Sequence, residues 1–151
     1  MKRKFLAVLV FLQACSYHLG PFASSNTHFQ VGQIQVRVAN PEVEHALSRA
    51  AATSIASRRG DASKAVNVHF ELLDFDAGPI APRGGFHRVS MTLLVQTDTN
   101  QRVTVQGTRE FLGSSDAEQT RLNQSGALQA LAVELAEQAV VRLTLQVEKE
   151  P

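Results

Sequence analysis

The chain has 151 residues, about the length of one ordinary domain, which argues against a second independent core. Hydrophobic residues make up 44% and charged residues 19%, a balance that excludes a disordered tail, a collagen-like chain and a coiled-coil rod. A formal net charge of +1 lacks the basic excess of a nucleic-acid-binding protein, and a single cysteine excludes a disulfide framework and a cysteine-based zinc site.

Residues 1–14 have the features of an export signal. Three basic residues, Lys2 to Lys4, precede an apolar run from Phe5 to Leu12. This run is far shorter than the roughly 20 residues that a membrane-spanning helix needs. We therefore predict a signal peptide over residues 1–14. Its removal leaves 12 basic against 14 acidic residues, so the remaining chain is mildly acidic.

The signal ends in a sequence that resembles the bacterial lipobox, Leu12-Gln13-Ala14-Cys15. In lipoproteins of this type a diacylglyceryl group is attached to the cysteine sulfur, and cleavage makes the cysteine the first residue. The only cysteine of the chain occupies this position, so we expect lipidation at Cys15. The alternative is a plain secretory signal followed by a buried free cysteine. Ser16 replaces the aspartate that retains many lipoproteins in the inner membrane, which favours the periplasmic side of the outer membrane.

Residues 15–32 contain Gly20-Pro21 and Ser24-Ser25-Asn26 without helical or alternating periodicity, and we interpret them as a lipidated tether. A single domain is then expected over residues 33–147. Its first strand is predicted from Gln33 to Val38, where apolar and polar residues alternate.

A helix should follow, because Asn40-Pro41-Glu42 combines a capping side chain, a proline suited to the first turn and an acidic residue for the positive end of the helix dipole. Its end is expected near Arg58-Arg59-Gly60. Apolar residues recur at every fourth position of this segment: Val43, Leu47, Ala51 and Ile55.

Three strands and a second helix are predicted in the rest of the chain. Alternation indicates strands over 66–72, 88–95 and 102–106, and the last two should form a hairpin around Asp98-Thr99-Asn100. Residues 113–123 are polar and loop-like. A helix should follow from a cap at Ser125, with one apolar stripe. The stripe consists of Leu128, Leu131, Ala132, Leu135, Ala136, Ala139, Val140 and Leu143.

The predicted order is strand, helix, three strands, helix. Strands with one apolar face and helices with one apolar stripe imply an α+β, two-layer sandwich. We expect a four-stranded, mostly antiparallel sheet with both helices on one face.

The sequence contains little that supports an enzymatic function. The five histidines have no metal-ligand spacing, and no nucleophile, phosphate-binding or dinucleotide motif occurs, so we expect no cofactor, no metal and no catalytic residue. Asp74 and Asp76 form a close acidic pair at the predicted end of a strand, where turn formation is the simpler explanation. Four arginines lie around the predicted sheet, and guanidinium groups can bind phosphate through two hydrogen bonds, although a solvated sheet face is the simpler explanation. They are Arg83, Arg88, Arg102 and Arg109.

The segment from Leu12 to Gly20, Leu-Gln-Ala-Cys-Ser-Tyr-His-Leu-Gly, resembles the start of the lipopolysaccharide-assembly lipoprotein family LptE. Its mature members typically begin with Cys, Gly, an aromatic residue, His and an apolar residue. Ser16 departs from this pattern, and the rest of the chain resembles the family only in its element order.

The resemblance implies a non-enzymatic outer-membrane lipoprotein that plugs the β-barrel LptD and helps to insert lipopolysaccharide (LPS) into the outer leaflet. Family members bind LPS through basic residues at a sheet edge and the adjoining loop, for which Arg83 and Arg88 are our candidates. The alternatives are another accessory lipoprotein, either a cell-wall synthase activator or a lipid-transport subunit, and a small periplasmic hydrolase using Asp74 and Asp76.

Overall fold

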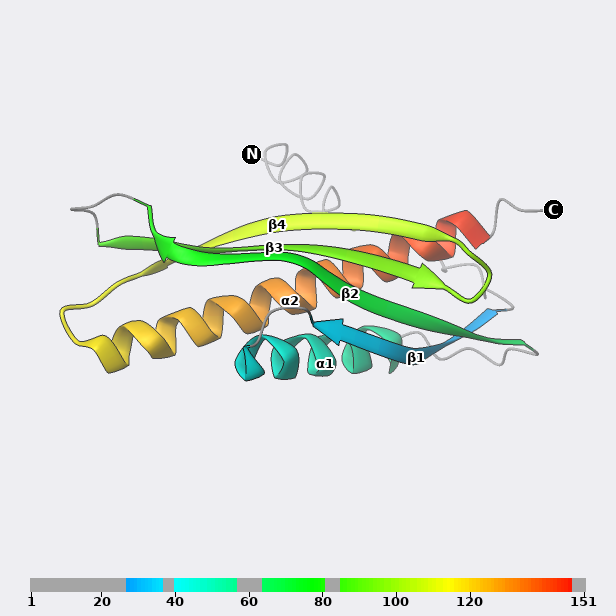
Figure 1. Cartoon of the computed structure of the whole chain (residues 1–151), viewed down its shortest axis with the longest axis horizontal. Coiled ribbons are helices and arrows are strands. Elements are labelled where there is room, and N and C mark those ends of the chain that lie inside the picture. Colours follow the sequence, from blue (N-terminus) through cyan, green and yellow to red (C-terminus); the bar gives the residue numbers. More distant parts are fainter. Residues whose placement is uncertain (1–26, 37–39, 57–63, 81–84, 148–151) are drawn as a thin grey trace, which may run out of the picture.

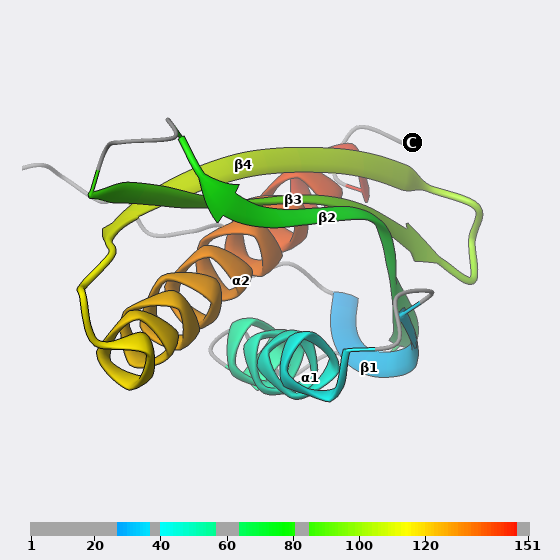
Figure 2. The same cartoon turned by 60° about the vertical axis from the view of Figure 1, so that its left-hand side comes forward.

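Six elements follow one another in the computed structural model, which describes residues 27–36, 40–56, 64–80 and 85–147 (Figure 1). Their order is β1 (Thr27–Val36), α1 (Pro41–Ala56), β2 (Lys64–Pro79), β3 (Phe86–Thr97), β4 (Arg102–Leu112) and α2 (Ala117–Val147). The four strands form one sheet, and both helices lie against the same face of it (Figures 1 and 2). The predicted two-layer α+β sandwich is confirmed.

The strands lie in the sheet in chain order, β1-β2-β3-β4. β1 and β2 are parallel, so the chain must cross over between them, and α1 belongs to this connection. The other two pairs are antiparallel, and β3 and β4 form the predicted hairpin. Asn100 in its turn has a φ of 65°, a left-handed conformation that asparagine adopts more readily than most residues.

The core lies between the sheet and the two helices. Leu72, Leu93 and Val105 stand next to one another across β2, β3 and β4, and all three are buried. The apolar stripe predicted for the second helix is buried in full, including Leu131 and Leu135. Each large apolar side chain that is fully buried in this way contributes about 1.5–3 kcal/mol through the hydrophobic effect.

α1 begins as its sequence predicts. The side-chain oxygen Oδ1 of Asn40 accepts hydrogen bonds from the backbone N–H groups of Glu42 at 3.1 Å and Val43 at 3.4 Å. Both bonds satisfy N–H groups that have no partner within the helix, which is the function of an N-cap. The four predicted apolar positions are buried, whereas the predicted end near Arg58-Arg59-Gly60 lies outside the described residues.

The first strand starts earlier than predicted. β1 begins at Thr27, so its first six residues come from the segment that we interpreted as tether. The register with β2 shifts between Val31 and Ile34, and this irregularity reverses the phase of the alternation. Phe29 and Ile34 therefore both face the core side, although their spacing does not suggest one strand. The final predicted residues, Arg37 and Val38, lie outside the described residues.

The second strand is longer than predicted, and the interpretation of Asp74 and Asp76 as turn residues is wrong. β2 continues to Pro79, and a register shift between Leu72 and Asp74 leaves Leu73 as an extra, 47% exposed residue. Beyond this bulge both aspartates point away from the helices, since their β3 partners belong to the exposed face. They share one strand face, as expected of period-two neighbours.

The last helix also starts earlier than predicted. α2 begins at Ala117, and its cap is Asp116, whose Oδ1 accepts a hydrogen bond from the Glu118 N–H at 2.9 Å. Ser125, the predicted cap, lies inside the helix. No residue from 117 to 126 is buried, so the first turns have no apolar stripe that periodicity could reveal.

Candidate functional site

The side of the sheet that faces away from the helices carries many polar side chains, and we call it the outer face. It is formed by alternate residues of β2, β3 and β4, and no described helix covers it (Figures 1 and 2). Its members include Asn67, His69, Glu71, Asp74, Asp76, Arg88, Ser90, Thr92, Gln96, Arg102, Thr104, Gln106, Thr108 and Glu110.

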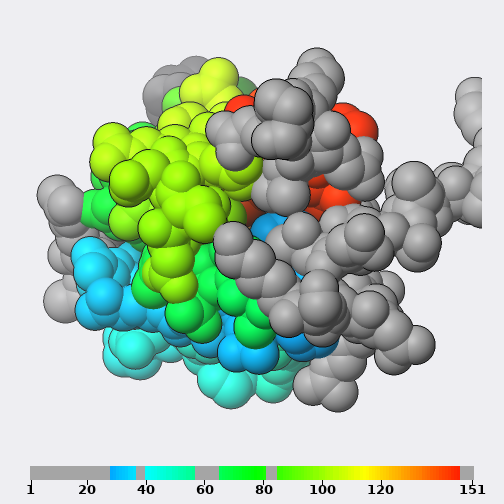
Figure 3. Space-filling model, turned by 90° about the vertical axis from the view of Figure 1, so that its right-hand side faces the viewer, coloured from blue at the N-terminus to red at the C-terminus, as the bar shows by residue number. Residues whose placement is uncertain are grey.

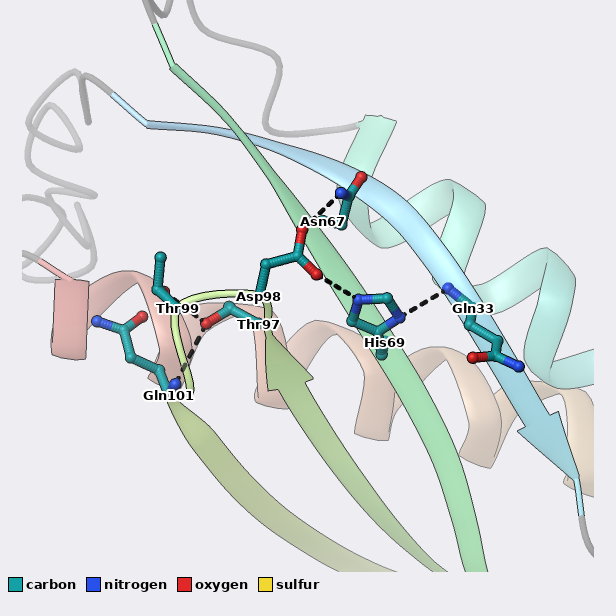
Figure 4. Close-up of polar contacts among 7 residues, drawn as sticks. All are labelled: Gln33, Asn67, His69, Thr97, Asp98, Thr99 and Gln101. Carbon is teal, nitrogen blue, oxygen red and sulfur yellow. Dashed lines mark hydrogen bonds and ion pairs between the residues drawn. The ribbon is translucent and has the colours of Figure 1, made fainter.

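A polar cluster around His69 lies at one end of this face (Figure 4). Nε2 of His69 is 2.7 Å from Oδ1 of Asp98, and the Asn67 side-chain amide donates to Oδ2 of Asp98 at 2.5 Å. The backbone N–H of Gln33 in β1 donates to Nδ1 of His69 at 2.9 Å. Since Nδ1 accepts a hydrogen bond, the geometry assigns the proton of the neutral ring to Nε2, which donates to Asp98.

Asp98 is the charged centre of the cluster. The hydrogen bond from His69 is the largest cause that lowers its pKa below 3.8, and the hydrogen bond from Asn67 is the next. The Asp98 backbone N–H also donates to the carbonyl oxygen of Asn67 at 3.3 Å. These bonds join β1, β2 and the β3–β4 turn. In Figure 3 this turn, in yellow-green, lies over the blue and green strands at its end of the molecule.

The cluster does not have the arrangement of a catalytic base. Both ring nitrogens of His69 are occupied by protein partners, so neither is left to accept a proton from a substrate. Within the described ranges, no group of three histidine, cysteine or acidic residues could hold a metal ion. His69 is a partly buried residue of β2, with 29% of its side chain exposed. The His69 ring packs closely on Gly32 of β1, where an added Cβ would lie 2.8 Å from Cε1 of the ring. This glycine is the one feature of the β1 sequence that indicates the contact.

Arg88, one of the two predicted LPS-binding residues, lies at the opposite end of the outer face. Its side chain is 52% exposed, and its guanidinium nitrogen is 4.0 Å from an Asp76 carboxylate oxygen. Its cross-strand neighbours are Gly78 and Glu110. Arg88 is therefore accessible to an anion, which would have to compete with two nearby carboxylates.

Exposed apolar side chains lie next to Arg88. Phe86 and Leu112 are direct cross-strand partners, 54% and 58% exposed, and Ile80 is 45% exposed. The Ile80 N–H donates to the Phe86 carbonyl oxygen at 3.0 Å, which places these residues together. This end of the sheet thus combines a cation with apolar surface.

None of the other predicted phosphate-binding arginines that the structure describes lies beside Arg88. Arg102 is on the outer face at the far end of β4, and Arg109 points toward the helix side, where it lies 3.6 Å from Glu134 of α2. Arg83 and Cys15 lie outside the described residues. The described arginines of the sheet therefore do not form one continuous basic patch.

The described helices include none that is both long and apolar enough to cross a membrane. The exposed residues of α2 include charged side chains along its length, such as Glu118, Arg121 and Glu134.

Solved structures of other proteins share this fold, including the following three. A candidate lipoprotein from Caulobacter crescentus superposes with a TM-score of 0.58 at 9% identity, covering 84% of this chain and 94% of that one. The rare lipoprotein B from Shewanella oneidensis gives a TM-score of 0.53 at 10% identity, covering 77% and 97%. A protein from Xanthomonas campestris gives 0.54 at 10% identity, covering 87% and 94%. No family model and no curated protein matches the sequence. At these identities the similarity establishes the fold.

Proposed function

We propose that this chain is an outer-membrane lipoprotein subunit of the lipopolysaccharide translocon, which plugs the β-barrel LptD and assists LPS assembly. The observation that carries the proposal is the segment from Leu12 to Gly20, in which the single cysteine ends a lipobox and begins an LptE-like mature N-terminus. The fold supports it, because two of the three structures described above are named as lipoproteins.

The layout of the described domain suits a tethered subunit. Thr27, the first described residue, lies at the end of the sheet that carries the β3–β4 turn. Arg88 and the exposed pair Phe86 and Leu112 lie at the opposite end (Figure 1). A lipid on Cys15 would hold the first end near the membrane through residues 16–26, a segment of eleven residues that spans at most about 40 Å. The end with Arg88 would then be presented to a partner or to LPS.

Recognition of LPS requires cations, because its headgroup carries phosphates. Arginine binds phosphate through two parallel hydrogen bonds, and such charge-assisted bonds contribute about 1.5–3 kcal/mol each. The exposed apolar residues beside Arg88 would suit the acyl part of the same ligand. We assign Arg88, with Arg83 of the segment that connects β2 and β3 in the sequence, as the LPS contact.

Affinity purification from cross-linked envelopes, followed by mass spectrometry, tests this function. We expect the LptD barrel to be enriched with the tagged full chain, and not with a tagged unrelated lipoprotein of similar abundance. Recovery of a peptidoglycan synthase or of another lipid-transport machine in place of LptD would contradict the proposal and identify the alternative role.

A further inference from the structure

Among the strands that the structure describes, β4 forms an open edge of the sheet. Of the described strands it pairs only with β3, and the register of that pair runs without irregularity from Phe86 and Leu112 to Gln96 and Arg102. The edge at β1 differs, because its register is interrupted between Val31 and Ile34. A long, regular edge strand has unpaired backbone groups that another strand can bind.

The hairpin fixes which residues of β4 offer these groups. The Thr97 N–H donates to the Gln101 carbonyl oxygen at 3.0 Å, so odd-numbered residues of β4 direct their backbone groups toward β3. The even-numbered residues direct theirs to the open edge. Their side chains lie on the outer face: Arg102, Thr104, Gln106, Thr108 and Glu110.

We propose that β4 is a self-association site, which pairs antiparallel with β4 of a second copy about a two-fold axis at Gln106. In this register Arg102 of each copy lies opposite Glu110 of the other, and Thr104 lies opposite Thr108. Opposite charges in such cross-strand positions are stabilising, and threonine pairs suit them equally well. The even-numbered side chains of the edge are thus complementary to their own two-fold copy.

The two charges at the ends of this set select the register. Arg102 and Glu110 are both exposed, and neither makes an ion pair with a residue that the structure describes. Only pairing centred on Gln106 places Arg102 of each copy opposite Glu110 of the other. A shift of the two strands relative to each other removes both contacts together. The self-paired edge therefore has one preferred alignment, not a series of equivalent ones.

The inner side of the strand accepts the same register. Val105 comes opposite Gly107 of the second copy, where there is no side chain to collide with. Arg109 comes opposite Val103 and keeps its own partner, Glu134, at 3.6 Å. The product is one continuous sheet of twice the width with all helices on one face. This association goes beyond the proposed function and does not depend on it.

Sedimentation equilibrium of the full chain in density-matched detergent tests the site, with Cys15→Ser in all samples so that lipid attachment does not differ among them. We expect a reversible dimer. The variants Arg102→Glu and Glu110→Arg each place like charges opposite each other and should weaken dimerisation about tenfold or more. An equimolar mixture of the two restores both opposite-charge contacts in the mixed dimer, so it should associate as tightly as the parent.

Arg49→Glu serves as the matched control, because it makes the same charge change on α1, away from β4. Circular dichroism must show the same fold for each variant. The site is overturned by a parent that stays monomeric at about 100 μM. It is equally overturned if Arg102→Glu and Glu110→Arg each dimerise as tightly as the parent, or if a mixture of the two variants stays monomeric.

Disulfide cross-linking checks the register independently. Gln106→Cys in the same Cys15→Ser background should form a disulfide-linked dimer, because the two positions face each other across the axis. Thr108→Cys alone should not, since its counterpart is displaced by four residues, about 13 Å along the strand. A mixture of Thr108→Cys and Thr104→Cys should cross-link. Efficient cross-linking of Thr108→Cys alone would overturn the register.

Discussion

Gly107 of β4 packs directly against Leu131 of α2. A Cβ added to this glycine would lie 3.0 Å from Cδ1 of Leu131 and 3.1 Å from Cδ2 of Leu135, so the absence of a side chain sets how closely helix and strand approach. Gly107→Val should lower the free energy of unfolding by about 1–3 kcal/mol, because it forces the two layers apart.

Chemical denaturation monitored by circular dichroism measures this loss. Gly78→Val is the control, since Gly78 also lies in a strand but has no atom within 4 Å of an added Cβ. We expect the control to stay within about 0.5 kcal/mol of the parent. Equal stability of both variants would show that α2 does not pack on Gly107.

The layers themselves were predictable because their patterns are uninterrupted. Val43, Leu47, Ala51 and Ile55 repeat at helical spacing behind an Asn40 cap, and the prediction of α1 is confirmed on both counts. Predictions were wrong where a bulge changed the phase of a strand, as beside Leu73, or where a helix had no buried residue, as in the first turns of α2. Hydrophobic periodicity arises from burial on one face, so it cannot predict helical turns that are exposed on all sides.

The sites were less predictable than the fold. The contact between Asp98 and His69 joins residues 29 positions apart, and it depends on a strand register that no local pattern encodes. Arg109 and Arg88 both belong to the sheet, yet Arg88 faces solvent whereas Arg109 faces α2. Successive residues of a strand point to opposite faces, so an error of one residue in the strand alignment exchanges the two sides.

The contact between Asp98 and His69 predicts an acid-sensitive stability. The pKa of Asp98 is lowered in the folded state, so its contribution is complete above the unfolded value of 3.8 and is lost as the pH falls through the folded pKa. The parent should therefore lose stability between about pH 5 and pH 2. Asp98→Asn lacks the carboxylate, so it should lose less stability over the same range. Urea midpoints measured across this range test it, with Asp74→Asn as the control. A parent and an Asp98→Asn variant with parallel pH profiles would rule out this contribution.

Lipidation at Cys15 predicts a loss of labelling on substitution. Cys15→Ala should take up no radiolabelled palmitate and should remain unprocessed or leave the membrane fraction, because the acceptor sulfur is absent. Ser16→Ala, which keeps the cysteine, should label like the parent. Palmitate incorporation into Cys15→Ala would show that the lipobox assignment is wrong.

Assignment of the LPS contact predicts a loss of affinity at one end of the sheet. The double variant Arg83→Ala, Arg88→Ala should bind purified LPS about tenfold or more weakly, because two charge-assisted contacts are removed. Arg109→Ala should bind like the parent, since Arg109 points to the helix side near Glu134. Titration at low salt, where such contacts are strongest, is the measurement. Unchanged affinity of the double variant would remove these two residues from the site.

Depletion of the chain in its native host, with quantification of LPS exposed at the cell surface, tests the proposed function most directly. We expect surface LPS to fall as the protein is depleted, and to recover when the parent chain is supplied but not when Cys15→Ala is supplied. Surface LPS that stays at its normal level after complete depletion would contradict a role of this protein in lipopolysaccharide assembly.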